Sequence, residues 1–353
     1  MESRLAARTF AGVASLNSAQ RRKLLDIHCY TQHGLVTRAG APTPHDPDPE
    51  LLQKHSPFRV VPVFMTNVCS KIGEARALSR AAQKAGKRRG LVPTMGALHE
   101  GHLSLVRAAK QRTDFVAVSI FVNPLQFGPS EDFSRYPRSF ERDRDLLQNE
   151  GVDLIFTPSV SEMYPRQALT YVNVDGLSER LDGKSRPGHF RGVTTVVAKL
   201  FHILEPEVAF FGQKDAAQLA IIRRMVHDLD LPVEIVGCPI VREPDGLAMS
   251  SRNAYLNAEQ RKQATVLYRS LMSISALFQQ GERNAARLIE SGSQVVHGGP
   301  SVRLDFLEVV DQDTLDSVQT IQKSALVAIA AFVGTTRLID NVLLQVTDSS
   351  KAH

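Results

Sequence analysis

The sequence has few cysteines and no long hydrophobic run, and each shortage argues against a class of protein. Cys29, Cys69 and Cys238 lie far apart and form no Cys-x-x-Cys pair. This spacing argues against a disulfide framework or a thiolate zinc site and fits a reducing compartment. No apolar run approaches the roughly 20 residues that a membrane-spanning helix needs, and the longest, Ala325 to Val333, is better explained as a buried strand. We therefore predict a protein that does not span a membrane.

Two familiar site motifs are absent as well. The P-loop pattern G-x-x-x-x-G-K-[ST] does not occur, and neither does the His-Glu-x-x-His pattern of zinc proteases. A phosphate or nucleotide site in this chain must therefore be built in another way. We predict no metal ligated by protein side chains.

Length and charge set only broad limits. The chain has 353 residues, a net charge of +5 and a pI near 9.1. This length suggests two domains plus additional sequence. A positive charge attracts nucleic acid, membrane surfaces or small anions such as ATP. The basic cluster around Lys84, Lys87, Arg88 and Arg89 has no interleaved aromatic residues, so we interpret it as a solvated helix end and predict no nucleic-acid partner.

The first part of the chain differs from the rest. Residues up to Gly40 are rich in arginine and poor in acids, and Ala41 to Glu50 (APTPHDPDPE) is rich in proline, which forbids a continuous helix. Two interpretations remain open at equal weight, a mitochondrial transit peptide and a disordered extension without an address. We predict that residues 1–64 lie outside the fold. We expect a cytoplasmic protein, with mitochondrial targeting as the alternative.

From Met65 onward, strand and helix patterns alternate. The expected strands are Gly90 to Val92, Phe115 to Val122, Asp153 to Phe156, Val208 to Phe211 and Val233 to Val241, and the expected helices are His102 to Lys110, Ser139 to Glu150 and Gly192 to Leu204. Such alternation predicts an α/β fold, a parallel sheet with helices on both faces. We assign residues 65–241 to this Rossmann-like catalytic domain.

The pattern changes after Arg242. Two helices are expected, Asn257 to Gln280 and Asn284 to Val296, followed by the strands Val302 to Val310, Ala325 to Val333 and Arg337 to Leu343. Helices followed by consecutive strands predict a smaller α+β domain, here residues 242–345, which would act as a lid. Residues 346–353 are expected to be a tail.

The first candidate for chemistry is His99-Glu100-Gly101-His102, between a strand and an amphipathic helix. A helix N-terminus offers free N–H groups and a positive dipole end to a phosphate. Two imidazoles three residues apart can stabilise charge on the same phosphate oxygens. The motif resembles the His-x-Gly-His pattern of adenylyl and cytidylyl transferases. The competing interpretation is an ordinary helix cap.

Two further segments have the polar residues of a phosphate site. Gly212-Gln213-Lys214-Asp215 directly follows an expected strand, where α/β folds bind ligands. Met249-Ser250-Ser251-Arg252-Asn253 offers two hydroxyls and a guanidinium after the Pro-Asp-Gly turn at residues 244–246. It resembles the KMSKS-type loop that closes on a triphosphate. An exposed turn and a helix N-cap are the structural alternatives.

Four longer segments are similar to the pantothenate synthetase family: Phe121 to Gly128, Tyr136 to Arg138, Arg186 to Val193 and Glu243 to Asn253. Together with the three motifs they cover about Met65 to Leu343 in consistent order. The resemblance implies ATP-dependent condensation of pantoate with β-alanine through pantoyl adenylate, releasing AMP and pyrophosphate. It further implies Mg²⁺ bound with ATP, and a homodimer.

The resemblance also assigns residues by motif position. For the phosphates it implies His99, His102, Lys214, Ser250, Ser251 and Arg252; for ATP binding, Met95, Gly96, Gly212, Asp215, Val241 and Met249; and for pantoate, Gln126, Gln218 and Asn123, with Met95 beside them. After Gly-Gln-Lys-Asp the family has Tyr-Gln-Gln, whereas this chain has Ala216-Ala217-Gln218. Gln218 is retained, but the packing around it must differ. His189 lies in a family motif, where its role is either structural or functional.

Two other functions compete. One is a different His-x-Gly-His adenylyltransferase that acts on a small phosphate or acid, such as pantetheine-phosphate adenylyltransferase. Those chains usually lack the Phe121 to Phe127 segment and the second domain. The other is a basic nucleic-acid-binding module. Its only support is the cluster near Lys84, and filter binding at physiological salt would test it.

Overall fold

The computed structural model describes residues 66–129, 131–298 and 302–346. The predicted extension, residues 1–64, lies outside the described residues, as does the predicted tail apart from Val346. By their internal contacts, residues 62–353 form one unit. The predicted boundary near Arg242 therefore stays a prediction, although two separate sheets lie on either side of it.

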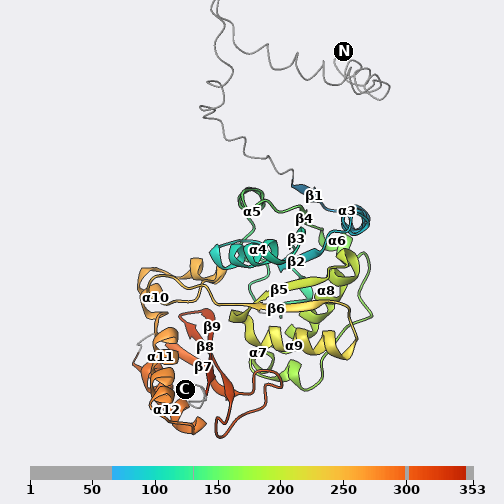
Figure 1. The fold of residues 1–353 in the computed structure, drawn as a ribbon. Coiled ribbons are helices and arrows are strands. Elements are labelled where there is room, and N and C mark those ends of the chain that lie inside the picture. Colours follow the sequence, from blue (N-terminus) through green and yellow to red (C-terminus); the bar gives the residue numbers. More distant parts are fainter. Residues whose placement is uncertain (1–65, 130, 299–301, 347–353) are drawn as a thin grey trace, which may run out of the picture. The chain divides into compact units, whose positions relative to one another are not determined.

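The first sheet has six parallel strands in the order β1-β4-β3-β2-β5-β6 (Figure 1). Their bounds are β1 Asn67–Cys69, β2 Arg89–Thr94, β3 Phe115–Ile120, β4 Leu154–Phe156, β5 Val208–Gly212 and β6 Glu234–Cys238. The expected strands are all present, and β1 is an addition. From β2 the order runs to β3 on one side and to β5 on the other. The carboxyl ends of β2 and β5 therefore form a topological switch point, where open α/β sheets bind ligands.

The helices of this part connect the parallel strands. They are α3 Ile72–Lys84, α4 Glu100–Arg112, α5 Phe140–Asn149, α6 Val160–Met163, α7 Asp182–Ser185, α8 His189–Leu204 and α9 Ala216–Asp228. Short 3₁₀ turns lie at η2 Pro124–Gln126, η3 Leu177–Glu179 and η4 Gln213–Asp215. Among the described residues no helix combines the length and apolar character that crossing a bilayer requires.

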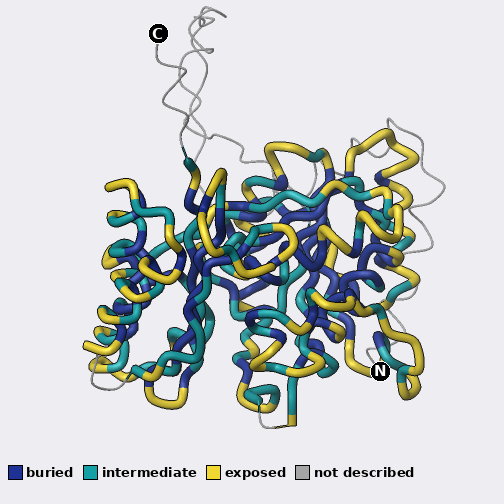
Figure 2. Tube along the Cα trace, turned by 90° about the horizontal axis from the view of Figure 1, so that it is seen from below, coloured by how far each residue is buried: buried dark blue, intermediate teal, exposed yellow. Residues whose placement is uncertain are grey.

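Both faces of the parallel sheet are covered, as the sequence predicts. Along β5, Ala209 and Phe211 pack in the cluster that contains α3, α8 and α9, whereas Val208 and Phe210 pack in the cluster that contains α4 and α5. Figure 1 shows α4 and α8 on opposite sides of the central strands. Side chains of a strand alternate between its faces, so an unbroken apolar strand needs helices on both. Figure 2 shows that the buried residues gather in the interior, with exposed residues around them.

The second sheet is antiparallel and has the order β7-β8-β9. Its strands are β7 Val302–Val310, β8 Ser324–Val333 and β9 Thr336–Gln345. One face packs on α11 Val266–Gln279 and α12 Ala285–His297. From the other face, Leu326 and Ala328 join the core of the parallel sheet. The α/β fold with a smaller C-terminal α+β part is thus confirmed.

The sequence prediction differs from the structure at one helix. Asn257 to Gln280 is two helices, α10 Ala258–Gln263 and α11, preceded by the 3₁₀ turn η5 Ser251–Tyr255. At the break, the backbone N–H and the hydroxyl of Thr265 both donate to the carbonyl oxygen of Lys262. This tight turn redirects the chain without a glycine or proline. The apolar pattern therefore continues across it and hides it.

Candidate active site

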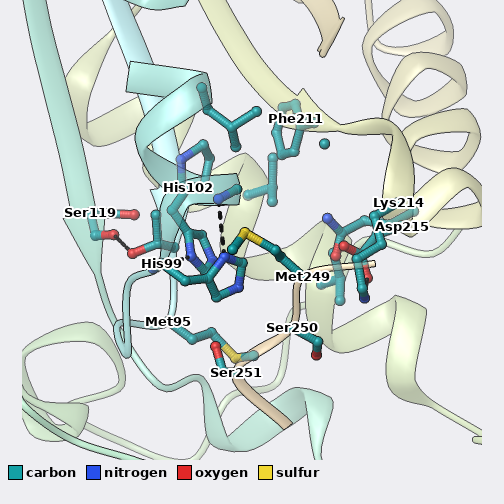
Figure 3. A pocket seen from close by; sticks show the side chains of 18 of the residues that line it. Met95, His99, His102, Ser119, Phe211, Lys214, Asp215, Met249, Ser250 and Ser251 are labelled. Atoms are coloured by element: carbon teal, nitrogen blue, oxygen red, sulfur yellow. Dashed lines mark hydrogen bonds and ion pairs between the residues drawn. The ribbon is translucent and has the colours of Figure 1, made fainter. Parts of the chain in front are cut away.

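A pocket opens at the switch point of the parallel sheet. It is lined from β2 by residues 93–95, from β5 by residues 211–215, and from the segment after β6 by residues 239–241 and 249–252. Figure 3 shows His99 and His102 on one side of this pocket and Lys214 with Asp215 on the other. All three candidate motifs therefore meet in one place. Chain topology brings them together across about 150 residues of sequence (Met95 to Arg252).

The two histidines form the N-terminal cap of α4. The backbone N–H of Gly101 donates to Nδ1 of His99 (3.2 Å), and that of His99 donates to Nδ1 of His102 (3.3 Å). Their ring centroids are 4.1 Å apart. The helix-cap interpretation of this motif therefore holds, and the functional interpretation stays a prediction. The capping bonds fix the rings while both side chains line the pocket.

The surroundings keep both rings neutral. Loss of solvent and the nearby Lys214 charge lower the pKa of His99 to about 4. Loss of solvent, His99 and Lys214 lower that of His102 to about 3. In each neutral ring Nδ1 accepts a backbone hydrogen bond, so the hydrogen lies on Nε2. The pair therefore offers two N–H donors without charge, a suitable arrangement for an oxyanion of phosphate.

Gly101 is required by the packing of the first histidine. A Cβ at this position would lie 2.9 Å from Cε1 and 3.0 Å from Nδ1 of His99. Real Cβ atoms essentially never approach so closely, so any larger residue would displace the ring. The glycine of the motif therefore creates space for the imidazole as well as access for a phosphate.

Asp143 on α5 holds the loop that precedes the histidines. Its buried carboxylate accepts hydrogen bonds from the N–H groups of Ala97 (2.7 Å) and Leu98 (2.9 Å). Ala97 has a φ of 52°, a left-handed conformation that residues other than glycine seldom adopt. Arg142 from the same helix donates to the carbonyl of Leu98 (3.1 Å). The loop is therefore fixed by α5.

Lys214 lies in η4, the turn after β5. Its Nζ is 3.8 Å from Oδ1 of Asp215. Asn341 from β9 donates to the carbonyl oxygens of Gln213 and Lys214, both at 2.9 Å. The second sheet thus holds this turn in place through two hydrogen bonds. The cation faces the two histidines closely enough to lower both of their pKa values.

The third segment reaches across the pocket to the first. Ser251 donates from its hydroxyl to the carbonyl of Ala97 (3.1 Å), and Ser250 caps η5 by accepting from the N–H of Arg252. Arg252 forms a two-pronged ion pair with Asp132 (3.0 and 3.1 Å). Burial raises the pKa of Asp132, but the hydrogen bonds and the charge of Arg252, together with smaller contributions, hold that pKa below its usual value. The ion pair occupies only Nε and Nη2 of the guanidinium, which lines the pocket in this arrangement.

The remaining wall is apolar with an amide at its edge. Val193, Val196, Val197 and Leu200 of α8 line it. Gln126 accepts from Nδ2 of Asn123 (3.1 Å) through Oε1 and directs Nε2 towards Sδ of Met95 (3.1 Å), beside the pocket. The amide therefore presents a donor to a bound molecule. This part of the pocket suits an acid with a branched aliphatic body and polar substituents.

Comparison with known proteins decides the family. The family model described as pantoate–β-alanine ligase matches residues 67–343. The chain belongs to the pantoate–β-alanine ligase family. The resemblance that its motifs indicate is confirmed. Like the family, the chain is an ATP-dependent ligase of pantothenate biosynthesis.

Relatives of this ligase family match nearly their full length. Pantothenate synthetase of Koribacter versatilis is 56% identical over 284 residues, which are 80% of this chain and 98% of the relative. That of Acidobacterium capsulatum is 61% identical over 261 residues, which are 74% of this chain and 87% of the relative.

Solved ligase structures share the fold. The crystal structure of pantothenate synthetase from Thermus thermophilus has a TM-score of 0.75 at 48% identity, covering 79% of this chain and 99% of that one. The crystal structure of the Francisella tularensis ligase, complexed with β-γ ATP and β-alanine, has a TM-score of 0.65 at 32% identity. The match covers 79% of this chain and 98% of that one.

Most residues that the sequence analysis selected line the pocket of this ligase. They are Met95, His99, His102, Gln126, Gly212, Lys214, Asp215, Gln218, Val241, Met249, Ser250, Ser251 and Arg252. Gly96 and Asn123 lie behind it. Gly96 has a φ of 82° and accommodates Asp143, while Asn123 is buried, bonded to Gln126, Gly192 and Tyr164. The individual ligand assignments stay predictions.

Two positions that the sequence left open are now placed. Ala216 and Ala217 are both buried in the core of the parallel sheet, so small side chains fill the space before Gln218. His189 contacts the backbone of Gln126 and does not line this pocket. Its Nδ1 bonds the carbonyl oxygen of Gln126 (2.8 Å), and its Nε2 faces Arg186 (3.0 Å). Loss of solvent and the Arg186 charge lower the pKa of His189 to about 4.

Several pocket or supporting residues were missed. The stripe at 193, 196, 197 and 200 has the i, i+3, i+4, i+7 spacing of one helix face, which sequence alone cannot distinguish from core. Tyr136 lines the pocket and stands in a quoted motif. No local sequence pattern marks Asp132, Asp143 or Asn341, because each acts through contacts with a distant segment.

Proposed function

We propose that this pocket condenses pantoate with β-alanine in two steps through a pantoyl adenylate. The observation that carries the proposal is the convergence of three segments suited to phosphates on one apolar, amide-edged wall suited to pantoate. A single pocket then holds the acid and the α-phosphorus together, which replaces an encounter of two molecules by a step within one complex.

In the first step, a carboxylate oxygen of pantoate attacks the α-phosphorus of ATP. The new O–P bond forms as the bond to the bridging oxygen breaks, and pyrophosphate leaves with that electron pair. Negative charge on the phosphate oxygens is met by the Nε2–H groups of His99 and His102 and by the ammonium of Lys214. Ser250, Ser251 and Arg252 bind the leaving phosphates. Because the histidines are neutral, they stabilise charge as hydrogen-bond donors.

In the second step, the amine of β-alanine attacks the acyl carbon of the adenylate. The amide bond forms, the C–O bond to phosphate breaks, and AMP leaves with the electron pair while the nitrogen loses a proton. The enzyme forms no covalent bond to either substrate. Its contribution is to orient the amine, exclude water from the mixed anhydride and hold the departing phosphate.

The acid is recognised by two amides and the apolar stripe. Nε2 of Gln126 and the side chain of Gln218 bind the hydroxyls and carboxylate of pantoate, with Asn123 fixing the first amide from behind. The two methyl groups of pantoate pack on Val193, Val196 and Val197 of α8. The nucleoside lies on the opposite side, near Gly212, Asp215, Val241 and Met249, with Met95 and Gly96 at the start of the phosphate loop.

Mg²⁺ enters with ATP. Among the described residues, no group of three or more His, Cys, Asp or Glu side chains is arranged to hold a metal ion. Mg²⁺ characteristically binds phosphate oxygens and water with few protein ligands. The residues present therefore fit an ion bound mainly by the triphosphate, where it neutralises charge, with Asp215 as the nearby carboxylate.

The decisive experiment identifies the products from ATP, pantoate and β-alanine. AMP, pyrophosphate and pantothenate are expected. Without β-alanine, pantoate should support exchange between pyrophosphate and ATP. Lys214→Ala and His99→Ala should each lower that exchange on the order of 100-fold, as loss of one oxyanion donor does. ADP and phosphate as products would exclude the adenylate, and exchange at the parent rate in both variants would exclude these roles.

We also propose a homodimer. Leu169 is 88% exposed and Tyr171 is 40% exposed in one extended segment between α6 and η3, a placement that supports burial in an assembly. Sedimentation equilibrium should give twice the chain mass, and Leu169→Glu should shift the chain towards the monomer. A parent chain that sediments as a monomer at micromolar concentration would contradict the proposal.

The compartment proposed is the cytoplasm. Cys69 and Cys238 are buried free thiols, as expected in a reducing environment. Imaging a reporter fused to residues 1–40 should give a diffuse cytosolic signal. A mitochondrial signal would identify a transit peptide instead.

A further inference from the structure

Asn341 connects the second sheet to the turn that carries Lys214. Its Nδ2 donates one hydrogen to the carbonyl oxygen of Gln213 and the other to that of Lys214, both at 2.9 Å. The residue lies in β9, more than 120 residues further along the chain, and is only 2% exposed. Both donors of one buried amide are thus committed to the backbone of η4.

The register of the second sheet explains why Asn341 reaches this turn. Asn341 pairs with Ala328, which packs in the core of the parallel sheet, whereas its neighbour Asp340 pairs with Ile329, which packs against the α11 and α12 cluster. Cross-strand partners share a face and adjacent residues of a strand face opposite sides. Asn341 therefore points to the catalytic side, and Asp340 to the helix side.

A second set of contacts fixes this part of β9. Arg242 donates to both oxygens of Asp340 (2.6 and 3.0 Å) and to the carbonyl of Asn341 (3.3 Å). Its guanidinium lies over the ring of Tyr268, 4.7 Å from the centroid. Arg242 directly follows Val241, whose carbonyl accepts from the N–H of Met249 (3.0 Å). The β9 segment therefore contacts both the turn at 213–215 and the loop that runs from Val241 to Met249, and it fixes their relative positions.

The two N–H donors of the amide suit a side chain that holds the backbone of η4 in place. An acceptor at this position would face two carbonyl oxygens, so only a group with two donors fits. The Oδ1 atom of Asn341 is buried without a hydrogen-bond partner among the described residues. An unpaired buried acceptor is unfavourable, and an apolar side chain would avoid it. Its presence is explained if the two donors are needed to set the turn.

We propose that Asn341 is a positioning residue that sets Lys214 for catalysis by fixing the backbone of η4. This inference rests on the proposed role of Lys214 at the phosphates. It makes the C-terminal sheet part of the ATP site, although no β9 side chain lines the pocket at the switch point. A shift of the turn would move the ammonium away from the α-phosphate without removing it.

The first test compares Asn341→Ala with Ser270→Ala. Ser270 is a fully buried residue of the same region whose hydroxyl donates to the carbonyl of Gly292 (2.8 Å), distant from η4 in the hydrogen-bond network. Asn341→Ala should lower pantoate-dependent pyrophosphate–ATP exchange on the order of 10- to 100-fold, as small misplacements of catalytic groups do. Its KM for ATP should rise more than its KM for pantoate. Ser270→Ala should lower the melting temperature and leave both KM values unchanged.

A double-mutant cycle with Lys214→Ala separates positioning from general damage. If Asn341 acts through Lys214, Asn341→Ala should cost little more exchange activity once the lysine is absent. Additive losses in the double variant would overturn the inference. So would an Asn341→Ala enzyme that melts earlier than the parent but keeps its exchange rate and KM for ATP.

The same cycle distinguishes this inference from the proposed function. A Lys214→Ala enzyme with parent activity would refute the lysine's proposed role itself. A strongly impaired Lys214→Ala enzyme beside an unimpaired Asn341→Ala enzyme would refute only the positioning role. Asn341→Asp, which keeps the shape and replaces both donors with acceptors, should behave like Asn341→Ala.

Discussion

At the residue scale, the two histidines show how a helix cap can set the tautomer of side chains that line a pocket. Each Nδ1 is occupied by a backbone N–H, so each neutral ring must donate through Nε2. Loss of solvent and Lys214 disfavour protonation of both rings. Their proton state is therefore decided by the fold and stays constant throughout the neutral pH range.

His102→Gln tests this arrangement. Glutamine at the third helix position can accept from the capping N–H, so the helix should start normally. Pyrophosphate–ATP exchange should fall on the order of 100-fold because one donor to the phosphate is lost.

The pKa of His102 falls from 6.5 to about 3 on folding, so the unfolded chain binds the proton first as the pH is lowered. Its contribution to the free energy of unfolding therefore decreases as pH falls from about 6.5 towards 3.

Melting temperatures between pH 7 and pH 4.5 check the predicted pH dependence of stability. The His102→Gln chain should lose less stability over that interval than the parent. His227→Gln, which replaces an exposed imidazole on α9, is the control and should match the parent in exchange. Equal pH dependence in parent and His102→Gln, or an unchanged exchange rate, would contradict the prediction.

Asp143→Asn tests the support of the histidine loop. Both carboxylate oxygens accept backbone N–H groups, so the amide must direct a donor at one of them. The cost should be about 1–3 kcal/mol of unfolding free energy. Exchange should fall on the order of 10- to 100-fold as the loop shifts. Denaturant unfolding and exchange kinetics measure these effects. Asp145→Asn, an exposed position on the same helix, should change neither. Parent-like exchange in Asp143→Asn would argue against the support.

At the scale of elements, the side of the pocket that we propose binds the acid depends on the close approach of α8 to η2. Gly192 of α8 lies against the η2 turn, which carries Gln126. A Cβ there would overlap the carbonyl group of Leu125 and lie 2.6 Å from the N atom of Gln126. The carbonyl of Gly192 also accepts from Asn123 (3.0 Å), which orients the Gln126 amide. One glycine thus links the apolar stripe to the amide beside it.

Gly192→Ala should therefore affect the acid more than the nucleotide. Displacement of η2 moves Gln126, so the KM for pantoate should rise at least about tenfold, while the KM for ATP should change much less. Steady-state kinetics with each substrate varied in turn provides the measurement. Gly73→Ala, in the first turn of α3 with no atom near its added Cβ, is the matched control and should behave as the parent. Equal rises in both KM values for Gly192→Ala would show general damage.

At the scale of the whole molecule, the pocket is lined from the parallel sheet and from the segment after β6, and contacts from both sheets support it. Every residue that lines the pocket at the switch point falls between Pro93 and Arg252. The second sheet contributes Asn341 to the lysine turn and Asp340 to Arg242, at the start of the loop that carries Met249. The predicted lid is thus bound to the nucleotide side through specific contacts.

A chain that begins at Met65 should keep its activity and its melting temperature. The family match starts at residue 67, and the first described strand begins at Asn67. The residues before Met65 include a segment rich in proline and aspartate, which would bury too little apolar area to offset the entropy of ordering. Turnover and thermal melting of the shortened chain provide the check. Loss of folding or of assembly would show that Pro57 to Phe64 is structural.

The sequence by itself was enough to predict the fold class and the family. Apolar strands alternate with amphipathic helices, so local periodicity was enough to predict the parallel sheet and the later antiparallel strands. The three motifs could be recognised because their residue types are those that phosphate requires. Sequence analysis missed the short strand β1 and the two-helix break at Thr265. The break escaped because a turn made by a hydroxyl and a backbone N–H leaves the apolar pattern intact.

The tertiary structure decided which residues support the site. Asp143, Asn341 and Asp132 each reach a motif far away along the chain, and a polar residue in a helix, a strand or a loop has no local mark of its distant partner. The structure also decided that Asn123 stands behind Gln126, and that both histidines are neutral. Hydrogen-bond partners and loss of solvent depend on long-range packing, which local sequence patterns do not specify.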